Sequence, residues 1–198
     1  MKQKLLHKLN KREGFSLTEM LATVLIMGFV GIIITTGATT VQRVYRKVVA
    51  HANAQTALTT SITLMKDQLA FADPESIGDG SGTGAFSGAS QTLSFQNLNS
   101  GEQTITLNPG SGMGTANRGF TLTYTAGDGT GTNSTTLPLL SDSAITSDLC
   151  VCFDGDGSGF SWDPATKVIT VTNLVAKDIR TDTVQAHASF KVLLVNGK

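Results

Sequence analysis

The feature that most constrains this 198-residue chain is an apolar run near its start, from residue 15 to residue 37. It reads FSLTEMLATVLIMGFVGIIITTG and contains a single charged residue, Glu19. As an α-helix this run would be about 34 Å long, which is enough to cross a bilayer core of about 30 Å. Because five Lys and Arg and only one acidic residue precede it, we expect the N-terminus to stay in the cytoplasm and the rest to be exported.

The ordinary explanations of such a run fit this one poorly. A cleaved secretory signal has an apolar core of about 7–15 residues followed by a small-x-small cleavage site. This run is longer, and its best cleavage signal lies before it. A plain membrane anchor fits the length but gives Glu19 no role, although a carboxylate inside an apolar span costs about 2.5–3.5 kcal/mol. The remaining ordinary explanation is that Glu19 lies close enough to the cytoplasmic end to reach the headgroups.

The residues around the start of the run favour a third interpretation. The sequence KREGFSLTEML, residues 11–21, resembles the class III signal of type IV prepilins and type II secretion pseudopilins. In that family a basic leader ends in Gly, the mature chain starts with Phe, and Glu is its fifth residue; Gly14, Phe15 and Glu19 match this pattern. The resemblance implies that residues 1–14 are a leader, which a membrane prepilin peptidase removes before it methylates the new amine of Phe15.

The resemblance also gives Glu19 a role in assembly. In the family this carboxylate pairs with the terminal amine of a neighbouring subunit, and here Glu19 lies about one helical turn after Phe15. A buried charge is tolerated when it is paired and costly when it is alone, so the pair would fix the register of a subunit in a filament. The implied partners are other pilin or pseudopilin subunits, the prepilin peptidase, the inner-membrane assembly platform and membrane lipid.

A helical pattern continues beyond the apolar run. Nine positions spaced three or four apart form a stripe, and seven of them are apolar: Val41, Val44, Val48, His51, Gln55, Leu58, Ile62, Met65 and Leu69. Asp73-Pro74 then stops the pattern, because a residue before proline disfavours helical backbone. We predict one helix over residues 15–72, with 15–40 in the membrane or filament core and 41–72 packing one face on a globular head. The stretch QTALTTSITLMKDQLAFA resembles the same part of larger minor subunits, the J- or W-type.

The composition of residues 73–198 is that of a β-rich head. Residues 76–90 are rich in Gly and Ser and predict a loop. Short β-branched runs predict strands: Thr92–Leu98, Thr104–Asn108, Phe120–Thr125, Leu149–Asp154, Lys167–Val175 and Ala188–Val195. The run SFKVLLV near the end predicts a well-buried strand. The expected fold class is α+β, with an antiparallel sheet packed on the long helix, and the resemblance implies that this is a type IV pilin-like fold.

Charge divides the chain and limits the partners of the head. Residues 73–198 contain six Lys and Arg against twelve Asp and Glu, whereas residues 1–14 carry a net charge of +4. Three cations, Arg43, Arg46 and Lys47, lie between these parts. Because nucleic acid is bound by neutralising its phosphates, we expect none to bind this acidic head. We also expect no enzymatic activity, since GxSxG, Walker and His-rich zinc motifs are absent from the sequence.

The two cysteines of the head leave alternatives open. An even number of cysteines permits a disulfide in an oxidising compartment, here between Cys150 and Cys152. A bridge across one intervening residue closes a small, strained ring. The alternative is a pair of thiols on one face of a strand.

The sequence DGDGSG that follows resembles the start of a calcium loop. Asp154, Asp156 and Ser158 place oxygen ligands at alternate positions. Ala165 occupies the place of the bidentate Glu, and Asp163 is the nearest carboxylate to it. These residues are therefore candidate ligands for Ca²⁺. The simpler alternative, which needs no metal, is an acidic hairpin turn between Cys152-Phe153 and Phe160-Trp162.

The resemblance therefore implies a structural subunit, a minor pilin or pseudopilin, of a type IV pilus or a type II secretion-type filament. One span would hold it in the cytoplasmic (inner) membrane with its head outside, and assembly would carry it into an extracellular filament. The alternative is a tip subunit of such a filament, adhesive or acting in DNA uptake, whose head binds a ligand.

Overall fold

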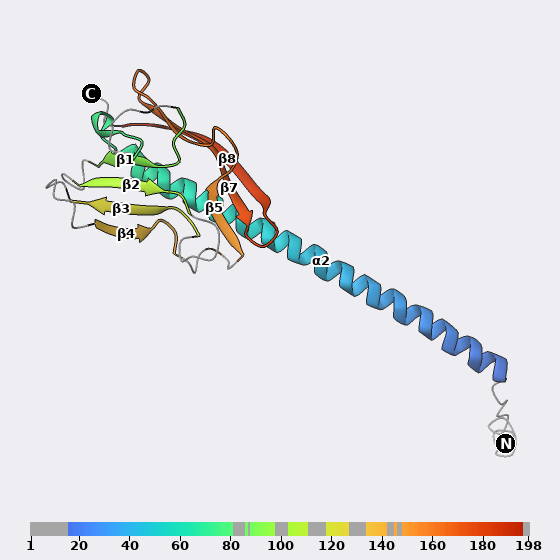
Figure 1. Cartoon of the computed structure of the whole chain (residues 1–198). Coiled ribbons are helices and arrows are strands. Elements are labelled where there is room, and N and C mark those ends of the chain that lie inside the picture. The colour runs from blue at the N-terminus through green and yellow to red at the C-terminus, as the bar shows by residue number, and fades with distance from the viewer. Residues whose placement is uncertain are drawn as a thin grey trace, which may run out of the picture. The chain divides into compact units, whose positions relative to one another are not determined.

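The computed structural model describes residues 16–80, 86, 88–97, 103–110, 118–126, 134–141, 145 and 148–195. In this part of the chain a long helix is followed by a short 3-10 helix, η1 (Pro74–Ser76), and by strands that form antiparallel sheets (Figure 1). The predicted α+β fold class is confirmed. The chain forms two compact units, residues 1–48 and residues 49–198.

The helix α2 (Leu17–Ala70) begins and ends within two residues of its predicted limits. Its first turn starts at Ser16, whose carbonyl oxygen accepts hydrogen bonds from the backbone N–H groups of Glu19 and Met20 at 2.9 and 3.1 Å. In the first unit, every side chain from residue 17 to residue 48 is exposed. This helix is long and apolar enough to cross a membrane.

In the second unit α2 has one buried face. Its buried residues recur at intervals of three or four, with Ala57 and Leu58 adjacent, as on one face of an amphipathic helix: Ala54, Ala57, Leu58, Ser61, Met65 and Leu69. The predicted stripe is confirmed at Leu58, Met65 and Leu69, and Ile62 is half-buried.

Two parts of the predicted stripe are not buried. His51 and Gln55 are exposed as expected, and their side-chain nitrogens lie 3.0 Å apart. Val41, Val44 and Val48, which belong to the first unit, are also exposed, and the packing of these three valines on the head stays a prediction. Their spacing continues that of the buried face, which is why the pattern alone did not separate them from it.

The described residues of the second unit form two antiparallel sheets, where the sequence predicted one. The first sheet has the order β1-β2-β3-β4, and its strands are β1 (Leu93–Gln96), β2 (Thr104–Asn108), β3 (Thr121–Thr125) and β4 (Ser134–Pro138). The strands of the second sheet are β5 (Leu149–Phe153), β6 (Gly159–Asp163), β7 (Val168–Asp178) and β8 (Thr183–Leu193). The long strand β7 pairs with β8 along one edge and with β5 and β6, placed end to end, along the other.

Two details of the second sheet correct the sequence-based expectations. Phe153 pairs with Leu174 of β7, and Gly159 pairs with Thr172, so residues 154–158 join two collinear strands instead of closing a hairpin. The run SFKVLLV is not uniformly buried, because Val192 is 6% exposed whereas Leu193 is 66% exposed. Among the described residues β8 pairs only with β7, and one of its faces is turned outward.

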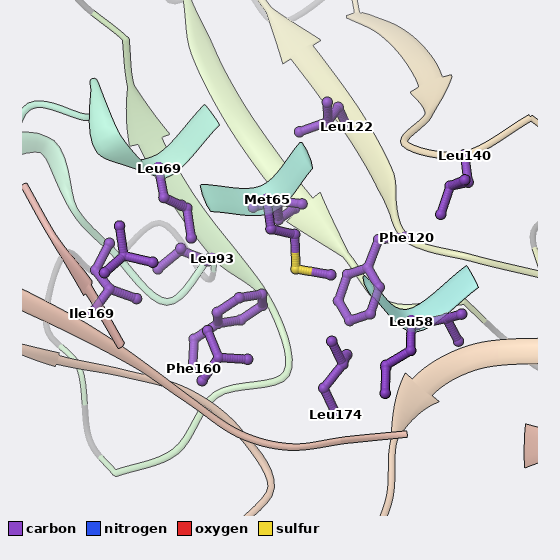
Figure 2. Close-up of a cluster of buried hydrophobic side chains, with 14 of the residues drawn as sticks. Leu58, Met65, Leu69, Leu93, Phe120, Leu122, Leu140, Phe160, Ile169 and Leu174 are labelled. Carbon is purple, nitrogen blue, oxygen red and sulfur yellow. The ribbon is translucent and has the colours of Figure 1, made fainter. Parts of the chain in front are cut away.

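The core of the second unit lies between α2 and both sheets. Figure 2 shows Met65 and Leu58 of α2 beside Phe120, which precedes β3, and near Phe160 and Leu174 of the second sheet. The ring of Phe120 packs edge-to-face on those of Phe153 and Phe160, with centroids 5.2 and 6.2 Å away. Such edge-to-face pairs add to the stabilisation that burial gives, so the rings help to join the two sheets.

The segment between η1 and β1 links both sheets through its backbone. Gly78 and Ser94 exchange two hydrogen bonds of 2.9 Å, which close the outer edge of β1. Ser90 exchanges two further bonds with Phe160 of β6, at 2.9 and 2.6 Å. Gly159 permits this approach, because its φ is +139° and a Cβ there would collide with the backbone carbonyl of Ser90.

Candidate functional site

The candidate assembly site lies at the start of α2. Gly14 and Phe15, the predicted cleavage and methylation residues, lie outside the described residues, as does the predicted leader 1–14. Glu19 is described, and it is exposed in the first turn of α2. The ion pairs of the described residues all lie in the second unit, so within the described part Glu19 has no cationic partner. Its charge is therefore available to a partner from outside.

The helix surface around Glu19 is apolar. Leu17, Leu21 and Phe29 are between 60% and 82% exposed, and they belong to an apolar surface that extends from Leu17 to Ile34. At Gly28 and Gly31 nothing lies within 4 Å of the position that a Cβ would take. Small residues of this kind let membrane helices approach each other closely. The surface can therefore associate with lipid or with another apolar helix.

The polar groups that follow are compatible with an apolar environment. Thr35 donates its hydroxyl hydrogen to the carbonyl oxygen of Gly31 at 2.8 Å, and Thr36 donates to that of Ile32 at 2.9 Å. Thr39 and Thr40 each donate to the carbonyl oxygen of Thr36, at 3.0 and 2.9 Å. A hydroxyl satisfied within its own helix carries a smaller desolvation cost in a membrane.

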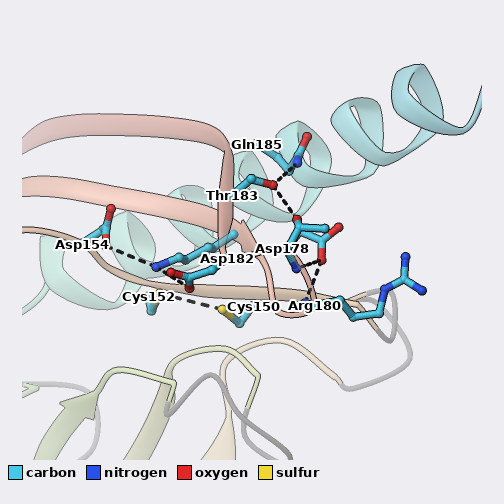
Figure 3. A network of polar contacts seen from close by, with 10 residues as sticks. Cys150, Cys152, Asp154, Asp178, Arg180, Asp182, Thr183 and Gln185 are labelled. Carbon is cyan, nitrogen blue, oxygen red and sulfur yellow. Dashed lines mark hydrogen bonds and ion pairs between the residues drawn. The ribbon is translucent and has the colours of Figure 1, made fainter. Parts of the chain in front are cut away.

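The two cysteines form a pair of thiols on β5. Cys150 and Cys152 are free cysteines whose Sγ atoms lie 3.9 Å apart (Figure 3). The Cα atoms of alternate residues in an extended strand are about 6.6–6.8 Å apart, which is the upper limit of the Cα–Cα distances of about 4.4–6.8 Å across disulfides. The backbone of β5, which is paired with β7 at both cysteines, therefore favours two thiols on one face. The disulfide stays a prediction.

The contact between the two thiols and the charge of the neighbouring Lys177 shift the pKa values of both cysteines. A hydrogen bond from the Cys152 thiol lowers the pKa of Cys150 to about 7, and the ammonium group of Lys177 acts in the same direction. The same bond, together with burial, raises the pKa of Cys152. Lys177 itself contacts Asp182 at 2.8 Å and Asp154 at 3.5 Å, and its hydrogen bond to Asp182 raises its pKa. The sequence did not single out Lys177, because only the register of β5 on β7 places it opposite Cys150.

The candidate calcium ligands follow β5. Asp154 faces Lys177, Asp156 is exposed, and the buried Ser158 donates its hydroxyl hydrogen to the carbonyl oxygen of Gly155 at 2.6 Å. Over the described ranges there is no cluster of three or more His, Cys, Asp or Glu side chains able to hold a metal. The hydroxyl of Ser158 retains a lone pair for a cation, but Lys177 competes for Asp154. Calcium binding stays a prediction for these residues.

Asp163 makes hydrogen bonds within the turn between β6 and β7. Its carboxylate accepts hydrogen bonds from the hydroxyl of Thr166 at 2.7 Å and from the backbone N–H of Ala165 at 3.0 Å. These bonds lower the pKa of the Asp163 carboxyl group.

In comparisons with known proteins, no family model, no curated protein and no solved structure matches this chain.

Proposed function

We propose that this chain is a structural subunit of a filament of the type IV pilus or type II secretion class, of the minor pilin or pseudopilin type. The observation that carries the proposal is the Gly14-Phe15 junction with Glu19 four residues beyond Phe15. It stands at the start of a helix that exposes an apolar surface from Leu17 to Ile34. A long apolar helix before antiparallel sheets is compatible with the pilin-like architecture.

In this proposal processing and assembly are linked through one charge pair. Cleavage after Gly14 turns the backbone nitrogen of Phe15 into a terminal amine, which the peptidase methylates. Glu19, whose carboxylate has no cationic partner among the described residues, then pairs with the amine of a neighbouring subunit. Because a carboxylate is costly in an apolar environment unless it is paired, a subunit gains most on leaving the membrane when a growing filament supplies that amine. A separate cytoplasmic ATPase would supply the energy.

Incorporation into filaments tests the role of Glu19. The chain and its Glu19→Gln variant are expressed in a host that supplies the peptidase and assembly platform, and sheared filaments are probed for each. We expect Glu19→Gln to be processed normally and to be depleted from filaments by at least about tenfold, since breaking a buried ion pair is strongly unfavourable. Asp67→Asn is the matched control, because Asp67 is an exposed carboxylate on the same helix in the second unit. Equal incorporation of Glu19→Gln and Asp67→Asn would refute the proposed pairing.

A further inference from the structure

Three cations lie on one face of α2 shortly after its apolar run. Arg46 and Lys47 lie three and four residues after Arg43, so the three side chains lie on one face of the helix. All three are exposed. We refer to these three side chains as the basic ridge. It belongs entirely to the first unit.

The basic ridge has no anionic partner within its own unit. The only acidic residue among the described part of that unit is Glu19, which lies 24 residues before Arg43. At 1.5 Å per residue this is about 36 Å along the helix, well beyond the Debye length of about 8 Å at physiological ionic strength. The ion pairs of the described residues involve Lys177 and Arg180 of the second unit instead. The basic ridge therefore presents three uncompensated charges.

Its position along the helix places the ridge at a membrane surface. This step depends on the proposed function, in which the apolar run crosses the bilayer. From Leu17 the helix rises about 39 Å to Arg43 and about 45 Å to Lys47. A bilayer with its headgroups is about 40–45 Å thick. An upright helix with Leu17 at one surface therefore carries the ridge into the opposite headgroup layer.

The other face of this segment also suits a headgroup layer. Val41, Val44 and Val48 are exposed there together with Tyr45, which is 68% exposed. Tyrosine is enriched where membrane helices meet water, because its ring is apolar and its hydroxyl is polar. At the end of a membrane span, long Arg and Lys side chains place their charges among the headgroups while their aliphatic stems stay on the apolar side.

We propose that the basic ridge binds the phosphate groups of anionic phospholipids where α2 leaves the membrane. Each cation near an anionic membrane surface strengthens association by about fivefold. The ridge then holds the subunit in the membrane at the side opposite Glu19 until assembly draws it out. A second copy of the chain is a poorer partner for this segment, because a parallel neighbour at the same height presents the same three cations.

Tryptophan fluorescence at position 45 tests this binding in the full chain. The variant Tyr45→Trp is made with Trp162→Phe, which removes the one natural tryptophan, and the protein is reconstituted into vesicles of phosphatidylcholine with or without phosphatidylglycerol. Quenching by acrylamide, which is uncharged and so is not repelled by the anionic lipid, reports how far the introduced indole is exposed to water. Resistance to alkaline carbonate extraction reports insertion in the same vesicles.

Charge variants supply the comparison. With phosphatidylglycerol at low salt we expect quenching to fall, and we expect this protection to be lost at high salt and in the variant Arg43→Gln/Lys47→Gln. The matched control Arg180→Gln/Lys191→Gln removes two exposed cations from the second unit and should keep the protection.

The outcomes separate this inference from the proposed function. Extraction of the unaltered chain by carbonate would overturn the membrane anchor and the lipid binding together. Retention of the chain with quenching that is independent of phosphatidylglycerol would overturn the lipid binding alone. Protection that appears equally in pure phosphatidylcholine and grows with the protein-to-lipid ratio would assign the segment to a second copy of the chain, and would overturn the lipid binding as well.

Discussion

Replacing Gly159 by alanine tests how the second unit is held together. Gly159 has a φ of +139°, a backbone conformation that L-residues rarely adopt, and a Cβ there would lie 2.8 Å from the carbonyl carbon of Ser90. Holding alanine in such a conformation costs about 1–3 kcal/mol. Relieving the collision would separate Ser90 from Phe160 and break the two hydrogen bonds that join them, at about 0.5–1.5 kcal/mol each. We therefore expect Gly159→Ala to lower the free energy of unfolding by about 4 kcal/mol.

A neighbouring glycine separates the backbone effect from the collision. Gly157 has a φ of +75°, but nothing lies within 4 Å of the position that its Cβ would take. Gly157→Ala should therefore lower the free energy of unfolding only by the cost of the left-handed conformation, about 1–2 kcal/mol. The difference between the two variants in free energy of unfolding measures how much the contact between Ser90 and β6 contributes to stability.

Urea unfolding in detergent micelles provides the measurement. Trp162 is the one tryptophan of the chain, and it lies on β6 two residues after Phe160, so its fluorescence reports the strand that the substitution disturbs. A Gly159→Ala variant that loses no more stability than Gly157→Ala would refute the close approach of Ser90 to β6.

Two further predictions concern buried polar groups of the second unit. Ser61 is fully buried on α2, and its hydroxyl has no hydrogen-bond partner among the described residues. Because an unsatisfied hydroxyl is destabilising and alanine is the better helix former, Ser61→Ala should raise the free energy of unfolding by about 1 kcal/mol. Urea titrations measure this, and a loss of stability would contradict the prediction. Absorbance of the thiolate against pH should give Cys150 a pKa of about 7, and Cys152→Ala should return it toward that of an ordinary thiol by removing the S–H donor. Because the pKa of Cys150 is lower in the folded than in the unfolded chain, its contribution to the free energy of unfolding should be lost as pH falls from about 9 through about 7. If Cys152→Ala leaves this dependence of stability on pH unchanged, the thiol–thiol hydrogen bond is ruled out as the cause.

Periodicity along the chain predicted the helix and several strands because each depends on local chemistry. The run that forms α2 has no proline before Asp73-Pro74, so its limits could be predicted within two residues. The strand β2 (Thr104–Asn108) matches its predicted range, since alternating residues are bounded by turn-forming ones. The strand β4 (Ser134–Pro138) was missed, because its five residues are all exposed and show no alternation of polar and apolar side chains.

Features that depend on pairing between distant segments could not be predicted. The collinear arrangement of β5 and β6 is set by β7, whose left-handed Asn173 interrupts the pairing opposite the loop 154–158. The position of Lys177 opposite Cys150 depends on the same register. For the candidate assembly site, by contrast, a contiguous motif was enough to propose Gly14, Phe15 and Glu19. Its recognition required only their spacing and an apolar run behind them.

The most direct test of the proposed function is the N-terminal sequence of the mature protein. The chain is produced together with a prepilin peptidase, recovered from the membrane fraction and examined by mass spectrometry of its N-terminal peptide. The proposed function predicts a chain that begins at Phe15 and carries one added methyl group on its terminal nitrogen. A mature protein that keeps Met1, or one cut after residue 37, would contradict it.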